Sequence, residues 1–320
     1  MEELYLGIET SCDDTSCAIY SPVRGVVPEI ASRSHMRTLL PLYETVMRES
    51  GAALASLSGI GVTNGPGLTG SLLVGLSFAK ALAYACGVPL AGVHHIEGHI
   101  LANALAGPLD LPALVLVVSG GHTQLIHMEN IGRYEIVGST RDDAAGEAFD
   151  KIGKLLGLPF PGGPAIERAA REGNAAAYDF PRGLRHSGGC DFSFSGLKTA
   201  VRLKVESFDE ITPRIVADVA ASAQEAIVES LVEKSILAAR ERNARRLYLA
   251  GGVASNGRLR EVMKERLAAA GVAVDWPRPE YCTDNAAMIA CAASYHIRAG
   301  LIDGLKLNSF ARGNLVNWAS

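Results

Sequence analysis

The sequence predicts an α/β protein with two similar lobes, each built on a largely parallel sheet. Its 320 residues suffice for about two domains that each bury a core. Hydrophobic residues make up 48% of the chain and charged residues 20%, which is ordinary for a folded globular protein. Three strand and helix patterns also recur in the same order in both halves, which indicates an internal duplication.

The first repeated pattern is a strand, a short polar or glycine turn and a second strand. The second is a strand, a glycine turn and a helix, and the third is a strand, a polar loop and a helix of small residues. Their positions are residues 5–20 and 114–128, residues 60–85 and 247–270, and residues 89–105 and 272–293.

The shared order of these patterns predicts where the lobes lie. We expect one lobe at residues 1–108 and the other at 109–320, with a helical, loop-rich insertion at about 158–213 in the second. In duplicated α/β proteins of this kind, a ligand is expected in the cleft between lobes, outside the carboxyl ends of the strands.

Composition and charge exclude several classes of protein. The 30 basic and 34 acidic residues give a net charge of −4, so unaided tight binding to a nucleic-acid backbone is not expected. The 34 glycines exceed the usual share of about 7%, which indicates loops where the backbone approaches a ligand or turns sharply. No export signal or membrane span is predicted, because the first residues are acidic and the apolar runs are short. The six scattered cysteines favour a reducing cytoplasm.

Two histidines four residues apart, His95 and His99, would lie on one face of a helix and could share a metal ion. The duplication places Asp284 at the matching position of the second half, and two imidazoles with one carboxylate leave coordination positions open. The spacing alone fits a metal site and a metal-free packing role equally well, and Asp284 could instead cap the next helix. A zincin protease is disfavoured, because Glu97 lies about 200° round a helix from His95.

A second group of residues has the composition of a nucleotide site. The turn at residues 119–123 has little side-chain bulk and several free backbone N–H groups, as phosphate binding requires, although a tight hairpin would need the same glycines. The glycines before Asn256 could let a base or phosphate lie on bare backbone, or Asn256 could simply cap the next helix. Asp150 and Glu167 could bind ribose hydroxyls or be solvated helix charges.

The insertion is locally basic, which makes it the best candidate for a macromolecular contact. Its basic side chains are Arg182, Arg185, Lys198, Arg202 and Lys204.

Taken together, nine strings resemble the TsaD family over nearly the whole chain. They are ETSCDDTS, GPGLTGSLLVG, HHIEGH, SGGHTQL, DDAAGEAFDK, PGGPAIE, DFSFSGLKTA, AGGVASN and TDNAAMIA. That family, formerly described as O-sialoglycoprotein endopeptidase, comprises tRNA adenosine threonylcarbamoyltransferases of the actin, sugar-kinase and heat-shock-chaperone (ASKHA) superfamily. The resemblance implies a cytoplasmic enzyme that moves the threonylcarbamoyl group from threonylcarbamoyl-AMP to N6 of the adenosine beside the anticodon, in tRNAs that read codons starting with A.

The resemblance also implies a role for individual residues. A divalent metal, usually iron and with zinc as the other candidate, would be bound by His95, His99 and Asp284. The nucleotide part of the adenylate would be bound by Val118, Ser119, Gly120, Gly121, His122, Asp150, Gly163, Glu167 and Asn256. No general base stands out. Implied partners are tRNA, a TsaB-like protein on the first lobe, a TsaE-like protein, and a TsaC-like enzyme that supplies the adenylate.

The sequence departs from the family pattern after Tyr20. Relatives usually have a further strand and a histidine-containing loop before the segment that matches GVVPE, so the first lobe is expected to lack about one edge strand. The main alternative function is therefore a nucleotide-binding, non-catalytic subunit of the same complex. A kinase or ATPase of the superfamily would not need the paired histidines, and a glycoprotease is further disfavoured by the missing H-E-x-x-H string.

Overall fold

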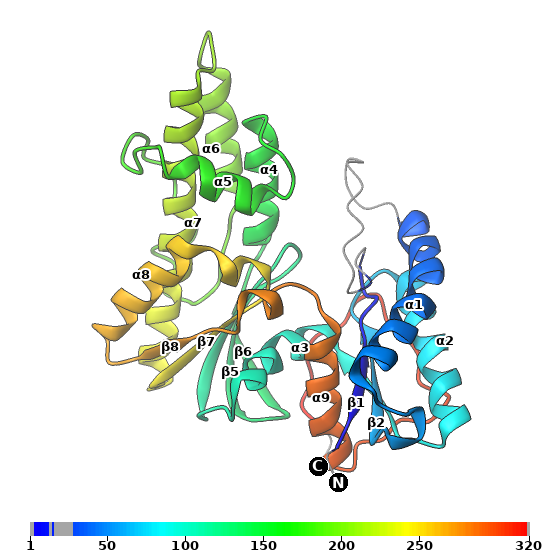
Figure 1. The fold of residues 1–320 in the computed structure, drawn as a ribbon. Coiled ribbons are helices and arrows are strands. Elements are labelled where there is room, and N and C mark those ends of the chain that lie inside the picture. The colour runs from blue at the N-terminus through cyan, green and yellow to red at the C-terminus, as the bar shows by residue number, and fades with distance from the viewer. Residues whose placement is uncertain (1–2, 13–14, 16–27, 319–320) are drawn as a thin grey trace. The chain divides into compact units, whose positions relative to one another are not determined.

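The computed structural model describes residues 3–12, 15 and 28–318 and divides the chain into two compact units (Figure 1). Unit 1 comprises Met1–Pro108 and Thr283–Val316, and unit 2 comprises Leu109–Cys282 and Asn317–Ser320. The first division coincides with the lobe boundary expected after residue 108. The second does not, because residues 283–316 belong to unit 1 rather than to the second lobe.

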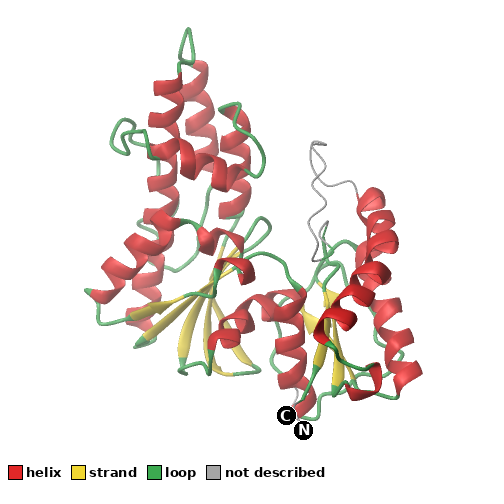
Figure 2. Cartoon of the chain, in the orientation of Figure 1, coloured by secondary structure: helices red, strands yellow, loops and turns green. Residues whose placement is uncertain are grey.

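Unit 1 contains a parallel sheet in the order β1-β2-β3 within the described residues. Its strands are β1 (Tyr5–Ile8), β2 (Gly59–Gly65) and β3 (Leu90–His94). Its helices are α1 (Pro28–Ser50), α2 (Thr69–Cys86), α3 (His95–Leu101) and α9 (Ala286–Arg298), with short 3-10 turns η1 (Leu54–Ser56) and η2 (Ala102–Ala106). Helices α1 and α2 lie on one side of the sheet and α9 on the other (Figure 2). This arrangement brings the carboxyl ends of all three strands to one edge.

Glycines on β1 and β2 explain why α9 packs in unit 1. A Cβ atom at Gly7 would lie 1.9 Å from the Ala286 carbonyl oxygen, and one at Gly61 would lie 2.4 Å from the Ala293 Cβ. Only a glycine surface admits an alanine-rich helix this closely. These glycines therefore serve helix packing rather than the binding loops that the glycine content suggested.

Unit 2 contains a mixed sheet in the order β6-β5-β4-β7-β8. The antiparallel pairs join β4 (Ala113–Val118), β5 (Thr123–Asn130) and β6 (Arg133–Ser139), and the parallel pairs join β4, β7 (Arg246–Ala250) and β8 (Ala273–Asp275). The helices are α4 (Ala145–Leu155), α5 (Gly162–Ala170), α6 (Ser195–Glu206), α7 (Pro213–Glu241) and α8 (Gly257–Ala268), with η3 (Gly252–Ser255) and η4 (Pro279–Tyr281). The expectation of largely parallel sheets thus holds for unit 1 and fails for half of the pairs in unit 2.

The repeated patterns correspond to real elements wherever the structure describes them. The glycine-turn patterns form β2 with α2 and β7 with α8, and the second strand–turn–strand pattern forms the β4–β5 hairpin. The expected second strand before Tyr20, and the departure that follows it, lie outside the described residues.

Among the described residues, one helix, α2, is long and apolar enough to cross a membrane by length and composition. A third of that window is buried, and α2 packs on β2 and α1. In the described part of the chain, Cys86, Cys190, Cys282 and Cys291 are free thiols.

Candidate functional site

The strand ends of unit 1 position a group of potential metal ligands. His95 is the first residue of α3 and directly follows β3, so the chain turns from strand to helix at this ligand. His99 lies one turn later on the same helix. Asp284 stands just before Asn285, which caps α9 by accepting a hydrogen bond from the Met288 backbone N–H. Asp284 is thus not the helix cap and is left to face the histidines.

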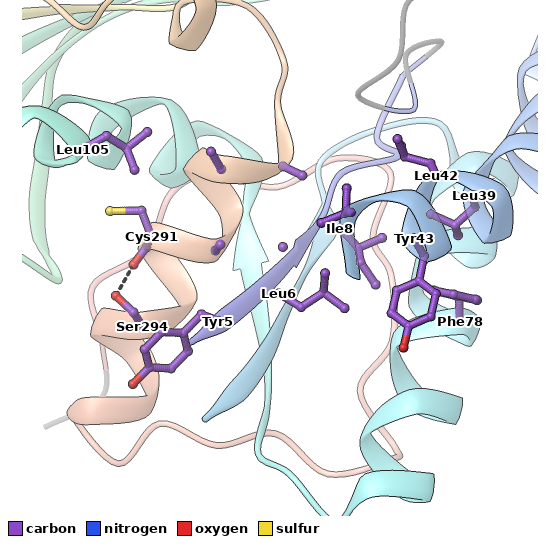
Figure 3. Close-up of a pocket in the computed structure, with 15 residues that line it drawn as sticks. Tyr5, Leu6, Ile8, Leu39, Leu42, Tyr43, Phe78, Leu105, Cys291 and Ser294 are labelled. Atoms are coloured by element: carbon purple, nitrogen blue, oxygen red, sulfur yellow. Dashed lines mark hydrogen bonds between the residues drawn. The ribbon is translucent and has the colours of Figure 1, made fainter. Parts of the chain in front are cut away.

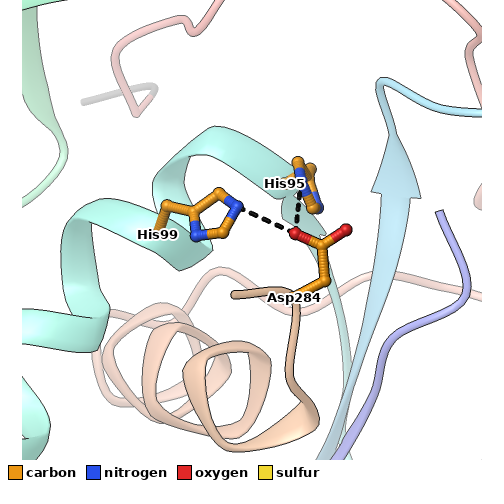
Figure 4. Close-up of side chains that lie close together, drawn as sticks. All are labelled: His95, His99 and Asp284. Atoms are coloured by element: carbon orange, nitrogen blue, oxygen red, sulfur yellow. Dashed lines mark hydrogen bonds and ion pairs between the residues drawn. The ribbon is translucent and has the colours of Figure 1, made fainter. Parts of the chain in front are cut away.

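Figure 4 shows that the three side chains converge. The Asp284 Oδ1 lies 3.1 Å from His99 Nε2 and 3.5 Å from His95 Nε2, and one ligand atom from each residue lies within 4.8 Å of the others. Nitrogen and oxygen ligands at about 2.1 Å from one cation would lie roughly 3 to 3.5 Å apart. The donor set therefore fits a divalent cation, and two imidazoles with one carboxylate suit iron(II) or zinc.

Two carboxylates, those of Glu9 and Asp284, lie beside His95. His95 is buried and its Nδ1 lies 3.1 Å from Glu9 Oε2. Burial alone would lower the pKa of His95, but Asp284 and Glu9 outweigh it and raise the pKa to about 9. Burial likewise would raise the pKa of Glu9, yet its interaction with His95 lowers it. A cation bound by His95 would therefore have to replace the proton that this raised pKa favours.

Two neighbours of the ligands have other tasks. His94 caps α3, because its Nδ1 accepts a hydrogen bond of 3.2 Å from the Ile96 backbone N–H, and burial lowers its pKa to about 4. Glu97 lies 2.7 Å from His296 Nε2 on α9. Since this carboxylate holds α3 to α9, it does not face the metal ligands as a zincin base would.

In unit 2, the turn at residues 119–122 closes the β4–β5 hairpin. The Ser119 N–H donates to the His122 carbonyl, and the His122 N–H donates to Ser119 Oγ. A Cβ atom at Gly120 or Gly121 would meet no atom within 4 Å, so the hairpin itself does not require either glycine for space. The Gly146 N–H in the first turn of α4 donates to the Ser119 carbonyl, which places a helix N-terminus against the turn.

The remaining nucleotide candidates link neighbouring helices of unit 2. Asp150 on α4 accepts a 2.7 Å hydrogen bond from the Gly162 N–H at the start of α5, and Glu167 on α5 accepts one of 3.1 Å from the Gly257 N–H at the start of α8. Asn256 caps α8, as the simpler interpretation expected, and its Nδ2 also donates to Gln224 Oε1. Gly163 has open space at its Cβ position. Hydrogen bonds thus connect the turn to α4, α4 to α5, and α5 to the start of α8.

Figure 3 shows a different feature, an apolar pocket of about 570 Å³ in unit 1. It runs along the edge of β1 and is lined by Leu39 and Tyr43 of α1, Phe78 of α2 and Cys291 of α9. The described residues that line it include none of His95, His99 and Asp284, so it is a feature separate from the group of potential metal ligands.

The basic side chains of the insertion are mostly neutralised within unit 2. Arg182 pairs with Glu229, Arg185 with Glu233, and Lys198 with Asp143. Lys204 lies over the ring of Tyr178. These contacts explain the helical packing of the insertion and leave less charge for a macromolecular partner than the sequence suggested.

Sequence reasoning missed Glu9, Ser11 and Thr63, which surround His95. Ser11 Oγ lies 3.0 Å from His95 Nδ1, and Thr63 Oγ1 donates to Glu9 Oε2 at 2.7 Å. The signal that could have found them is a polar residue at the carboxyl end of each apolar strand beside a ligand.

Comparison with known proteins gives consistent matches. A family model described as TsaD, tRNA N6-adenosine threonylcarbamoyltransferase, matches residues 11–291. A relative of that name from Verminephrobacter eiseniae (strain EF01-2) is 48% identical over 321 residues, covering 93% of each chain. Another from Desulfitobacterium hafniense (strain Y51) is 50% identical over 316 residues, covering 91% of each.

These relatives have residues that this chain lacks. The alignment with the Verminephrobacter relative spans 321 positions, whereas 93% of the 320 residues of this chain is about 298 residues. At about 23 positions of that alignment, the relative therefore has a residue and this chain has none. The expected absence of about one edge strand in the first lobe stays a prediction.

Among solved structures, HypF of T. kodakarensis has a TM-score of 0.59 at 15% identity, covering 93% of this chain and 47% of that chain. This chain spans about half the length of that protein, and at this identity the likeness concerns the fold alone. The likeness to HypF supports an α/β fold for this chain. The match over most of the chain and the high identity to curated relatives show that the chain belongs to the TsaD family.

Proposed function

We propose that this chain transfers the threonylcarbamoyl group from threonylcarbamoyl-AMP to N6 of the adenosine beside the anticodon, in tRNAs that read codons starting with A. The observation that carries the proposal is the convergence of His95, His99 and Asp284 in a chain whose curated relatives bear the name of this transferase. A non-catalytic subunit would have no need to keep three metal ligands together.

We assign one divalent cation, iron(II) or zinc, to His95, His99 and Asp284. When bound, the cation would supply a Lewis acid that polarises the carbonyl of the threonylcarbamoyl group. The His99 side chain is fully buried and that of Asp284 is 27% exposed, so substrate would approach from the aspartate side. Glu9 and Asp284 offset the positive charge of a cation at this buried position.

We assign the adenylate part of the donor to unit 2. The support is the turn at residues 119–122, which is adjacent to the N-terminus of α4, and the contacts that join α4, α5 and the start of α8. Backbone N–H groups of the turn would bind phosphate oxygens. Asp150 would accept a hydrogen bond from a ribose hydroxyl with the oxygen other than the Oδ1 that holds α5. Glu167 would do so with Oε2, which also accepts a 3.4 Å hydrogen bond from Asn256 Nδ2.

The reaction forms one bond and breaks another. The N6 nitrogen attacks the threonylcarbamoyl carbonyl carbon, the bond from that carbon to the phosphate oxygen breaks, and AMP leaves with the electron pair. The N6 nitrogen loses one proton, and no side chain of the described residues is assigned as its acceptor. The contribution of the chain is to hold donor and acceptor in register.

The proposal includes partners and location. Unit 1 would bind a TsaB-like protein through apolar side chains exposed on α1 and α2, Met36, Leu40 and Leu73. A TsaE-like protein and a TsaC-like source of the adenylate complete the system, which would work in the cytoplasm. We further assign the two units to the lobes of a duplicated actin-like (ASKHA) fold, of which the first is shortened.

For tRNA, we assign the hollow between α4 and α6. It is lined by Lys151, Lys154, Lys198 and Arg202. Lys151 and Lys198 both contact Asp143, whereas Lys154 is exposed to solvent. The net charge of −4 means that tRNA binding depends on such a local surface and on the partners.

The test is reconstitution with the partner proteins, ATP, bicarbonate, labelled threonine and unmodified tRNA. Label is expected in tRNA with the wild-type chain and not with His99→Ala, which should remain folded by circular dichroism. Failure of the wild-type chain to transfer label while it still binds metal and nucleotide would instead favour a non-catalytic subunit. Undiminished transfer by His99→Ala would remove the metal assignment.

A further inference from the structure

The carboxyl ends of three strands bring a buried polar group against His95. Glu9 follows β1, Thr63 lies on β2, and His95 follows β3. Because Ile8 pairs with Val62 and Thr63 pairs with Val93 in parallel register, these side chains share one edge of the sheet. Glu9 is 2% exposed and Thr63 is fully buried, so their polar atoms depend on protein groups rather than on solvent for hydrogen bonds.

The Glu9 carboxylate is itself fixed from two sides. Its Oε1 accepts a 2.6 Å hydrogen bond from the Ser11 backbone N–H, and its Oε2 accepts a 2.7 Å hydrogen bond from Thr63 Oγ1. The same Oε2 lies 3.1 Å from His95 Nδ1. A carboxylate with these partners has one orientation, and it presents an acceptor to His95.

The contact with Glu9 determines which imidazole nitrogen of His95 is free. A deprotonated carboxylate can only accept hydrogen bonds. Glu9 therefore forms a hydrogen bond with His95 when the Nδ1 of that histidine carries a hydrogen. The other nitrogen, Nε2, is the one that lies 3.5 Å from Asp284 Oδ1 in the ligand group. Ser11 Oγ is also near Nδ1, but a hydroxyl can donate as well as accept and does not by itself select this arrangement.

We propose that Glu9 is a positioning residue that orients His95 and keeps its Nε2 free for the metal ion. Hydrogen bonds of this kind to a ligating histidine fix its ring and increase its basicity. His99 differs, because its Nδ1 is buried without a hydrogen-bond partner in the described part of the chain. Glu9 would therefore make His95 the more strongly oriented of the two histidine ligands. The inference rests on the metal site proposed above.

The test compares two glutamates that each contact a histidine. Glu9→Gln removes the charge beside His95, and Glu97→Gln makes the same change at an equally buried glutamate that contacts His296 at 2.7 Å. Zinc and cobalt(II) affinities are measured by chelator competition on the full-length chain without donor or tRNA. Glu9→Gln is expected to weaken binding about 10- to 100-fold, while Glu97→Gln stays within about threefold.

Two outcomes of the affinity measurement would overturn the inference. One is wild-type affinity in Glu9→Gln. The other is equal weakening in both variants, which would indicate a general effect of losing a buried charge. Wild-type chain that binds no zinc would overturn the metal site itself, whereas zinc binding without transfer to tRNA would contradict only the proposed activity.

A second measurement reports on the ring directly. In zinc-loaded wild-type protein with nitrogen-15 histidine, His95 should show a protonated Nδ1 and a zinc-bound Nε2. If His95 binds zinc through Nδ1, the inference fails. Should Glu9→Gln not fold, Thr63→Val removes one of the hydrogen bonds that hold the Glu9 carboxylate and should weaken zinc binding by a smaller factor. A folded Thr63→Val with unchanged affinity would then count against the role of Glu9.

Discussion

A proton competes with the cation for His95. The carboxylates of Asp284 and Glu9, acting against burial, raise the pKa of His95 in the metal-free protein to about 9, above its ordinary value of 6.5. The charged imidazole therefore stabilises the metal-free fold fully below pH 6.5, and this stabilisation is lost as the pH rises through about 9. Zinc must displace the proton over the same range.

We predict that the apparent zinc affinity rises by up to about tenfold per pH unit between pH 6.5 and 8.5. The measurement is chelator competition at each pH, with the chelator's own protonation included. His95→Gln should bind zinc more weakly and lose most of this slope. A flat affinity in the wild-type chain would contradict the raised pKa.

Gly121 tests whether the hairpin turn binds the donor. Its Cβ position is open, so Gly121→Val should not disturb the fold, but the added methyl groups would meet a phosphate lying on the turn. We predict weaker adenylate binding by calorimetry, by about tenfold or more, with unchanged thermal unfolding. Gly189→Val is the matched control, since its Cβ position is open as well. Equal affinity in Gly121→Val and wild type would mean that the turn is only a hairpin.

At the scale of residues, sequence could predict which three side chains converge but not which side chains support them. His95 and His99 are visible through their spacing, and Asp284 through the duplication. Glu9 could not be assigned to them, because its contact with His95 depends on the register of three strands. For Asn256, sequence could predict that its side chain caps α8, but it could not predict that the same side chain also donates to Gln224.

At the scale of elements, α9 packs so closely on the glycines of β1 and β2 that an added side chain there should destabilise unit 1. We predict that Gly61→Ala destabilises the chain by about 1–3 kcal/mol, because its Cβ would lie 2.4 Å from the Ala293 Cβ and 3.0 Å from the Ile289 carbonyl. The loss should appear in urea unfolding. Gly304→Ala, in the same unit and with open space, should change stability little. Equal stability of both variants would show that α9 can move away from β2 without cost.

The hollow between α4 and α6 gives a prediction for tRNA binding. Lys154→Glu should weaken tRNA binding and reduce its salt dependence, because an exposed cation would be replaced by an anion. The control is Lys264→Glu on α8, which makes the same charge change at another exposed lysine of unit 2. Affinity is measured by filter binding at several salt concentrations in the presence of the partners. Equal effects of the two variants would remove the special role of this hollow.

Most elements could be predicted from the sequence, whereas their assignment to units could not. The glycine-turn patterns gave β2 with α2 and β7 with α8, because glycine and apolar periodicity are local signals. Helix α9 follows β8 in sequence, and the repeat therefore placed it with the second lobe. It belongs to unit 1 because Gly7 and Gly61 admit it there, and nothing in α9 alone reports this long-range fit.

At the scale of the whole molecule, the two units carry different parts of the proposed chemistry. The proposed metal ligands all belong to unit 1, and the nucleotide candidates all belong to unit 2. Sequence could predict the family because its motifs extend over both units, and the family match at residues 11–291 confirms that prediction. The mixed sheet of unit 2 was less predictable, since the antiparallel β6 has no counterpart in the repeated patterns.

The most direct test of the central claim is a metal titration of transfer. Metal-free chain is prepared with a chelator, iron(II) or zinc is added in steps, and transfer of threonylcarbamoyl to tRNA is measured with the partner proteins present. We predict that the transfer rate rises with bound metal and saturates at about one metal per chain, and that His95→Ala neither binds the metal tightly nor transfers. Full transfer by the metal-free chain, or by His95→Ala, would contradict the assignment of His95, His99 and Asp284 as the metal centre of the reaction.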